Sequence, residues 1–183
     1  MKILMSLLII YLPAASQPQN LYNFPVDSTT GKIYFSGVVE KPGISKDLIY
    51  TRTKIWIAQT FNSAKAVINM DDKESGIIKV KGNYSEDTLL NKRVYTKTTQ
   101  FNLFIYFKDG RYKYDVTDIM TDPGIAGVGF VADEPFLSID KNDKNYIKYS
   151  HQWQQAADNL KTHMVSLAMS LDKAISTKSA AEF

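Results

Sequence analysis

Apolar residues recur at every second position along residues 30–39, where Ile33, Phe35 and Val39 lie on one side of an extended chain. Such alternation is typical of a β-strand with one buried face. The Lys-Pro-Gly sequence at residues 41–43 is expected to end this strand.

The following stretch predicts a helix of about 16 residues with one apolar stripe. Ser45 is a good N-cap, and Asp47 in the first turn complements the helix dipole. The expected stripe consists of Ile49, Thr53, Trp56, Ile57 and Thr60.

Short alternating runs predict four more strands, at residues 64–70, 76–82, 93–108 and 111–119. The acidic residues 71–75 are expected to form the turn between the first two. Asp109 and Gly110 separate the last two strands, and Asp-Gly between alternating apolar runs strongly indicates a hairpin. Because short turns link these strands, the sheet should be largely antiparallel.

Residues 121–145 have no clear period and form an irregular connection that contains glycine and proline. Beyond it, apolar residues repeat at steps of three and four: Tyr146, Tyr149, Trp153, Ala156, Leu160, Met164, Leu167, Leu171 and Ile175. This pattern predicts a long helix over residues 146–176, followed by a tail at residues 177–183.

The expected fold is therefore α+β, with a mostly antiparallel five-stranded sheet in the element order β-α-β-β-β-β-α. Both helices carry a single apolar stripe, so both are expected to cover the same face of the sheet. The opposite face is expected to be open. The core of this fold should span residues 30–120.

Residues 1–16 have the features of a cleavable signal peptide. One lysine precedes the apolar residues 3–12, and the small residues Ala14 and Ser16 follow, so cleavage is expected after Ser16. The apolar run is shorter than the roughly 20 residues that span a bilayer. We therefore expect an exported protein, periplasmic or extracellular, with no transmembrane segment after cleavage. Residues 17–29 are expected to form a polar lead-in to the folded domain.

The composition narrows the class of protein further. The chain has 183 residues, 44% of them hydrophobic, and a formal net charge of +3, which is typical of a single folded domain. It contains no cysteine, which excludes a disulfide scaffold, a zinc finger, thiol catalysis and a lipid-anchoring cysteine.

Several spaced segments between residues 28 and 120 resemble one known family. They are the GVVE, PG and SKD segments from Gly37 to Asp47, the KIWIA sequence at residues 54–58, and the AKAVI and DDKESG sequences within residues 63–76. The chain is similar in these segments to the domain of unknown function 4468 family, described as having a TBP-like (TATA-binding-protein-like) fold. The resemblance implies an exported bacterial protein with a helix-backed sheet, and it supplies no catalytic residue.

The residues themselves reveal no catalytic, cofactor-binding or metal-binding set. His151 and His163 are twelve positions apart on the last helix, which places them about 120° apart and on different faces. A Ser-x-x-Lys sequence begins at Ser138 and again at Ser170, but the partner motifs of penicillin-binding enzymes are absent. The chain is therefore expected to need no cofactor, and an enzymatic role is not favoured.

One candidate binding surface remains. Because Phe101, Leu103, Ile105 and Phe107 are assigned to the helix-covered face, period two places a second set on the open face. This candidate partner surface consists of Tyr34, Phe104, Tyr106, Lys32 and Lys108, with Val38, Lys79, Lys81 and Lys113 as further members. Between Gly76 and Lys113 the chain has eight basic and three acidic residues, a local excess that favours an acidic partner or an anionic surface.

The leading hypothesis is a non-enzymatic exported module that binds a protein or an anionic envelope component through its open sheet face. Three alternatives remain for that face: residues 121–145 cover it, two copies of the chain meet there, or it is an ordinary solvated surface. The second functional hypothesis is a small-ligand carrier or enzyme, with a pocket between the open face and residues 121–145. The export signal argues against nucleic acid as a partner.

Overall fold

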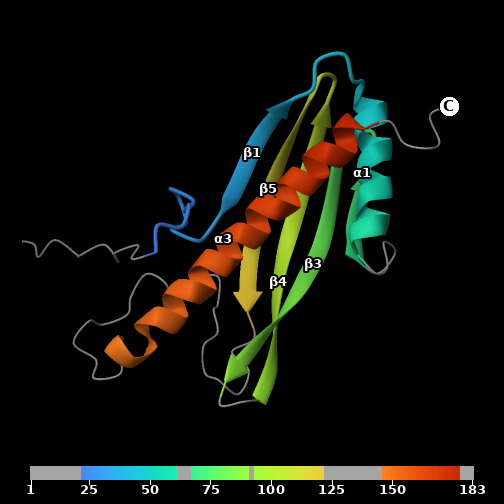
Figure 1. Ribbon diagram of the computed structural model, residues 1–183. Helices are drawn as coiled ribbons and strands as arrows, with labels where there is room; N and C mark the ends of the chain where they lie inside the picture. Colours follow the sequence, from blue (N-terminus) through green and yellow to red (C-terminus); the bar gives the residue numbers. More distant parts are fainter. Residues whose placement is uncertain (1–21, 62–66, 91–92, 122–145, 178–183) are drawn as a thin grey trace, which may run out of the picture.

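The computed structural model describes residues 22–61, 67–90, 93–121 and 146–177, and within them five strands form one antiparallel sheet (Figure 1). The elements in chain order are β1 (Phe35–Glu40), α1 (Lys46–Thr60), β2 (Ile68–Asp72), β3 (Ile77–Leu90), β4 (Arg93–Lys108), β5 (Arg111–Thr121) and α3 (Tyr146–Ser176). The strands lie side by side in the order β1-β5-β4-β3-β2. The expected α+β fold and element order are confirmed.

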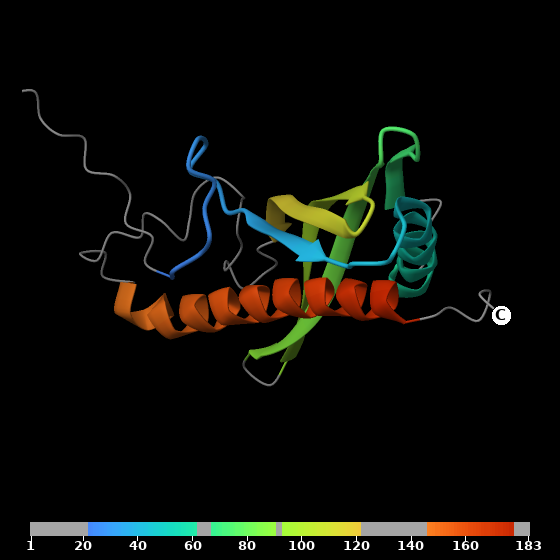
Figure 2. The same ribbon diagram turned by 90° about the horizontal axis from the view of Figure 1, so that it is seen from above.

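Both helices lie on the same face of the sheet, as expected. Figure 1 shows α3 crossing the sheet diagonally, and Figure 2 shows it running along one side with no helix of the described residues on the other. On α1, Trp56 donates its indole N–H to the Ser170 hydroxyl of α3 at 3.1 Å. The Arg52 guanidinium of α1 donates to the backbone carbonyl of Ile175 at 2.5 Å. These two bonds join the helices into one layer.

The core lies between this helical layer and the sheet. On β4, the side chains that the sequence assigned to the covered face are all buried: Phe101, Leu103, Ile105 and Phe107. Ile49 and Ile57 of α1 and Leu171 of α3 are also buried among them. The period-two assignment of β4 is therefore correct.

The segment before β1 contributes to the core, which its polar composition did not predict. Tyr22 and Phe24 are buried, and the Phe24 ring meets the Phe35 ring edge-on at 6.4 Å between centroids. Val26 forms an antiparallel bridge with Ile33. This short ribbon lies at the start of β1, where it pairs with the outer side of the chain up to Tyr34.

Two expected strand boundaries were wrong. β3 continues past residue 82 to Leu90, because its second half pairs with the first half of β4 through polar contacts such as Ser85 with Thr98 at 2.9 Å. Asp71 lies within β2 rather than in a turn, because it pairs with Ile78 of β3, and its carboxylate accepts bonds from Tyr50 and Lys54 of α1.

Several expectations concern residues outside those described. They are the signal peptide at residues 1–16, the lead-in before residue 22, the connection at residues 122–145 and the tail beyond residue 177. Within the described residues, no helix combines the length and hydropathy needed to cross a membrane.

Candidate binding surface on the open sheet face

The structure places the candidate residues on the face that the helices leave open. On β4, Phe104 pairs with Lys79 of β3 and Asp115 of β5, while Tyr106 pairs with Lys113 of β5. Directly opposed residues of antiparallel strands project from the same face, so these side chains lie side by side.

Phe104, Tyr106, Lys79 and Lys113 form what we call the aromatic–lysine patch. The two rings are nearly parallel, with centroids 6.4 Å apart and an interplanar angle of 10°. The Lys79 ammonium lies 5.0 Å from the Phe104 centroid, and the Lys113 ammonium lies 5.5 Å from the Tyr106 centroid. Both distances are within the range of cation–π attraction, so a lysine partly covers each half-buried ring.

Asp115, which sequence reasoning missed, connects Tyr34 to this patch. Its carboxylate accepts bonds from the Tyr34 hydroxyl at 2.5 Å and the Ser36 hydroxyl at 2.7 Å, and it pairs with Lys113 at 2.8 Å. Burial alone would raise the pKa of Asp115, but the bonds from Lys113, Tyr34 and Ser36 outweigh burial and hold its pKa below the usual value. Asp115 therefore holds three side chains, from β1, β5 and the residue directly before β1.

The other candidates are less closely joined to the patch. Lys108 lies at the far end of β4, opposite Arg111, and is exposed. Lys32 precedes β1 and is half-buried. The hydrogen bond from Asn102 is the largest cause that lowers the pKa of Asp118, and the charges of Lys32 and Lys79 add to it. Of the five predicted residues, the structure brings together Tyr34, Phe104 and Tyr106.

The positive charge of this face is smaller than the sequence count indicated. Lys97, which was included in that count, is buried on the helix-covered face. Lys113 is neutralised by Asp115, and the side chains of residues 92 and 93 are outside those described.

Three lysines of the open face nevertheless have no carboxylate within ion-pair distance among the described residues. Lys79, Lys81 and Lys108 form no ion pair within the described part of the chain. Lys79 and Lys81 are two positions apart on β3 and project from the same face, next to Phe104. The combination of paired cations and an accessible ring is suited to a partner that carries carboxylates beside apolar groups.

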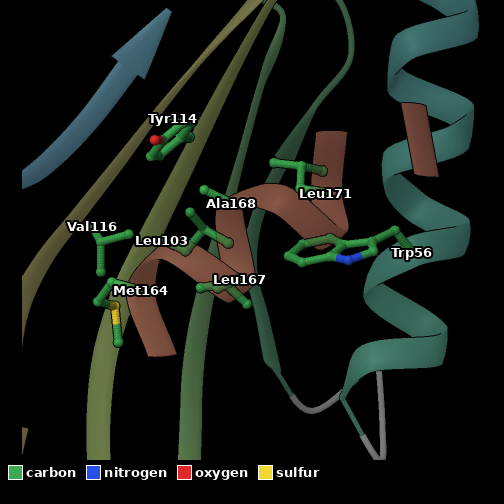
Figure 3. A pocket seen from close by; sticks show the side chains of 8 residues that line it. All are labelled: Trp56, Leu103, Tyr114, Val116, Met164, Leu167, Ala168 and Leu171. Carbon is green, nitrogen blue, oxygen red and sulfur yellow. The ribbon is translucent and has the colours of Figure 1, made fainter. Parts of the chain in front are cut away.

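On the opposite face, a small apolar cavity lies beneath α3. Figure 3 shows its lining, which comes from α1, α3, β4 and β5: Trp56, Leu103, Tyr114, Val116, Met164, Leu167, Ala168 and Leu171. Its volume of about 10 Å³ is no more than one water molecule needs. In this structure the cavity is a packing gap that cannot hold an organic ligand.

The motifs considered for chemistry have structural roles where their side chains are described. Ser170 accepts from Trp56 and donates to the backbone carbonyl of Leu167 at 2.8 Å, so its hydroxyl is engaged. The His163 ring stacks on Tyr84 at 3.9 Å between centroids. Among the described residues, no three side chains of the metal-ligating types come together.

Part of this chain matches the model of a known family. The family model described as "Domain of unknown function (DUF4468) with TBP-like fold" matches residues 35–121, which run from β1 to the end of β5. No curated protein matches the chain.

Two solved structures have the same fold. A DUF4468 family protein from Bacteroides ovatus superposes with a TM-score of 0.63 and 16% identity, covering 85% of this chain and 92% of its own. A TBP-like protein from Parabacteroides distasonis gives a TM-score of 0.62 and 20% identity, covering 85% of this chain and 98% of its own. The sequence-derived resemblance is confirmed: residues 35–121 match the DUF4468 family model, and the chain has the TBP-like fold.

Proposed function

We propose that this protein is an exported, non-enzymatic binding module whose open sheet face binds an acidic segment of another envelope protein. The observation that carries the proposal is the aromatic–lysine patch, where Lys79 and the neighbouring Lys81 form no ion pair with a described residue and lie beside the half-buried Phe104 ring. Export rests on the signal-like residues 1–16.

Carboxylates on the partner would approach Lys79 and Lys81, while an apolar side chain would contact Phe104. Met70 of β2 extends the apolar part, because it lies opposite Lys79 on the same face and is 47% exposed. Rim charges of this kind speed association and set the salt dependence, whereas the central aromatic residue supplies the buried contact.

The test is to express the tagged full-length chain in its native host, cross-link the envelope and identify the proteins that co-purify. Two variants are compared with the parent: Phe104→Asp with Tyr106→Asp, and Lys79→Glu with Lys81→Glu. Both are expected to lose the same partner, and added salt should weaken its capture by the parent.

Two control variants carry the same kinds of change elsewhere. Val94→Asp places a carboxylate at an exposed position of the same strand, and Lys173→Glu reverses an exposed charge on α3. Both controls should retain the partner. Equal capture by the parent and by the patch variants would refute the proposal, and so would capture of an anionic polysaccharide without a protein.

Circular dichroism separates a lost surface from a lost fold. The Phe104 and Tyr106 side chains are absent from the hydrophobic core, so the double aspartate variant is expected to fold. If it unfolds instead, the patch is structural and the proposal is wrong.

A further inference from the structure

The outer edge of β1 has backbone groups that no described residue pairs with. β1 is an edge strand of the sheet. Directly after it, the Lys41 N–H points toward β5 and donates to the Gly110 carbonyl at 2.6 Å. The Tyr34 N–H points the other way and bonds the Pro25 carbonyl at 2.9 Å. Because alternate residues of a strand point their backbone groups in the same direction, those of Ser36, Val38 and Glu40 point away from β5.

The start of this edge is already used, and only its later part is free. The ribbon formed by Val26 and Ile33 covers the edge up to Tyr34. The free stretch therefore runs from Ser36 to Glu40, with Val38 at its centre. Edge strands of stable monomers are commonly protected by a charge, a proline, a bulge or a cover, and the centre of this stretch has none of them among the described residues.

Apolar side chains are exposed on both sides of the same edge. On the open face, Val38 is 60% exposed. On the helical face, a groove beside β1 is lined by Val39, Tyr114, Ala168, Met169, Ser170, Asp172 and Lys173, and Met169 is 66% exposed. Val165, one turn before Met169 on α3, continues this apolar surface.

We propose that two copies of this chain pair antiparallel through their β1 edges, with Val38 of one copy opposite Val38 of the other across a two-fold axis. This register places Ser36 opposite the second copy's Glu40, and Gly37 opposite the second copy's Val39. It uses all the outward-pointing groups of the free stretch. The two sheets become one continuous sheet, with both open faces on the same side.

A second copy of this chain is assigned as the partner because the free stretch of β1 is complementary to itself. The free stretch is centred on a single exposed valine, so a two-fold axis buries that side chain against its own equivalent. Gly37 has the Tyr114 ring directly above it, since a Cβ built there would lie 2.7 Å from that ring. The second copy's Val39, opposite Gly37, therefore meets the Tyr114 ring at the groove that Met169 lines.

Sedimentation velocity over a wide concentration range tests the proposal. The sample is the full chain expressed in its native host, so that any signal peptide is removed as in the cell. The parent is expected to show a reversible monomer–dimer equilibrium. Val38→Lys should weaken association by about tenfold or more, because two like charges would face each other directly. Val94→Lys is the matched control, since Val94 is 65% exposed but distant from β1, and it should associate like the parent.

Two further variants test the register itself. A mixture of Val38→Lys and Val38→Asp should associate more strongly than either variant alone, because the unlike charges then face each other. The chain has no cysteine, so Val38→Cys introduces a single thiol. Hydrogen-bonded antiparallel pairs have Cα atoms about 5.5 Å apart, within disulfide range, so Val38→Cys should cross-link on oxidation faster than Val94→Cys.

Each result decides the proposal. A parent that remains monomeric at every concentration overturns it, as does a Val38→Cys variant that cross-links no faster than Val94→Cys. Loss of folding by Val38→Lys, followed by circular dichroism, would also overturn it, because an exposed edge residue should tolerate lysine. These outcomes are independent of whether the patch variants lose an envelope partner.

Discussion

Replacing Asp115 with asparagine tests whether this carboxylate holds the open face together. Asparagine keeps the shape of the side chain and one acceptor oxygen, but it loses the charge. Its amide group would also face Lys113, so two donors would meet where an ion pair now lies at 2.8 Å. We expect the variant to fold with lower stability and with Tyr34 and Lys113 less firmly held.

The magnitude follows from the exposure of the two partners. The Asp115 side chain is only 9% exposed, so its hydrogen bonds are of the charge-assisted, partly buried kind, which contribute about 1.5–3 kcal/mol. The Lys113 side chain is 42% exposed, so solvent screens the ion pair and adds less than about 1 kcal/mol. Because asparagine retains part of the bonding, the net loss should be about 2 kcal/mol, or about 4–8 °C in Tm for a chain of this size.

The loss should depend on pH in a defined direction. The folded-state pKa of Asp115 lies below its ordinary value of 3.8, so the stabilisation is present above that value and is lost as the pH falls through the folded pKa. The difference in Tm between parent and Asp115→Asn should therefore be full near neutral pH and shrink in acid. Thermal unfolding followed by circular dichroism measures both quantities.

Asp87→Asn is the matched control for this experiment. Asp87 is exposed and accepts one bond from the Thr96 hydroxyl at 2.7 Å, so its replacement should cost less than about 1 kcal/mol. Equal Tm losses in the two variants, or a loss for Asp115→Asn that does not change with pH, would refute the reasoning. A double-mutant cycle with Lys113→Met then isolates the energy of the ion pair.

Two other predictions concern the helix-covered side. Gly82→Ala should destabilise the fold by about 1–3 kcal/mol in urea unfolding, because the new Cβ would lie 2.5 Å from the Phe101 ring. The neighbouring exposed change Asn83→Ala should cost little, and equal stability of the two variants would show that the ring moves aside freely. Burial raises the pKa of Tyr84 to about 12. The difference between the ultraviolet titration curves of the parent and Tyr84→Phe should therefore have its midpoint at that pH. A midpoint near the ordinary value of 10.0 would contradict the burial of Tyr84.

Strand faces could be predicted from the sequence because alternate residues of a strand point to opposite faces, so each strand leaves a single choice between two sets. Along β4, large side chains occupy both sets of alternate positions, so the pattern alone does not say which set is buried. The sequence analysis assigned one set to the face that both helices cover, and that set is buried in the structure: Phe101, Leu103, Ile105 and Phe107. That single assignment also placed Phe104 and Tyr106 correctly on the open face.

Contacts between distant segments could not be predicted in the same way. Tyr34 and Asp115 are 81 positions apart, and their bond depends on the register between β1 and β5. Period two does indicate that Asp115 shares a face with Lys113, but it gives no register. The burial of Phe24 likewise depends on Phe35 and on Lys161 of α3, whose ammonium lies 5.3 Å from the Phe24 ring. The sequence of the short polar segment around Phe24 does not indicate either contact.

The two lysines of the patch differ in what they can contribute to binding. Lys113 already has a carboxylate partner in Asp115, so a second carboxylate gains little from it and meets repulsion from the first. Lys79 lies over the Phe104 ring and forms no ion pair with a described residue, so it can turn toward a partner without breaking one. Lys79 and Lys81 should therefore be the cations that meet the partner's carboxylates, while Lys113 keeps Tyr106 and Tyr34 in place. If β1 edges pair as proposed, each assembly presents two such sites on one surface, and an acidic partner with two segments would bind far more tightly than either segment alone.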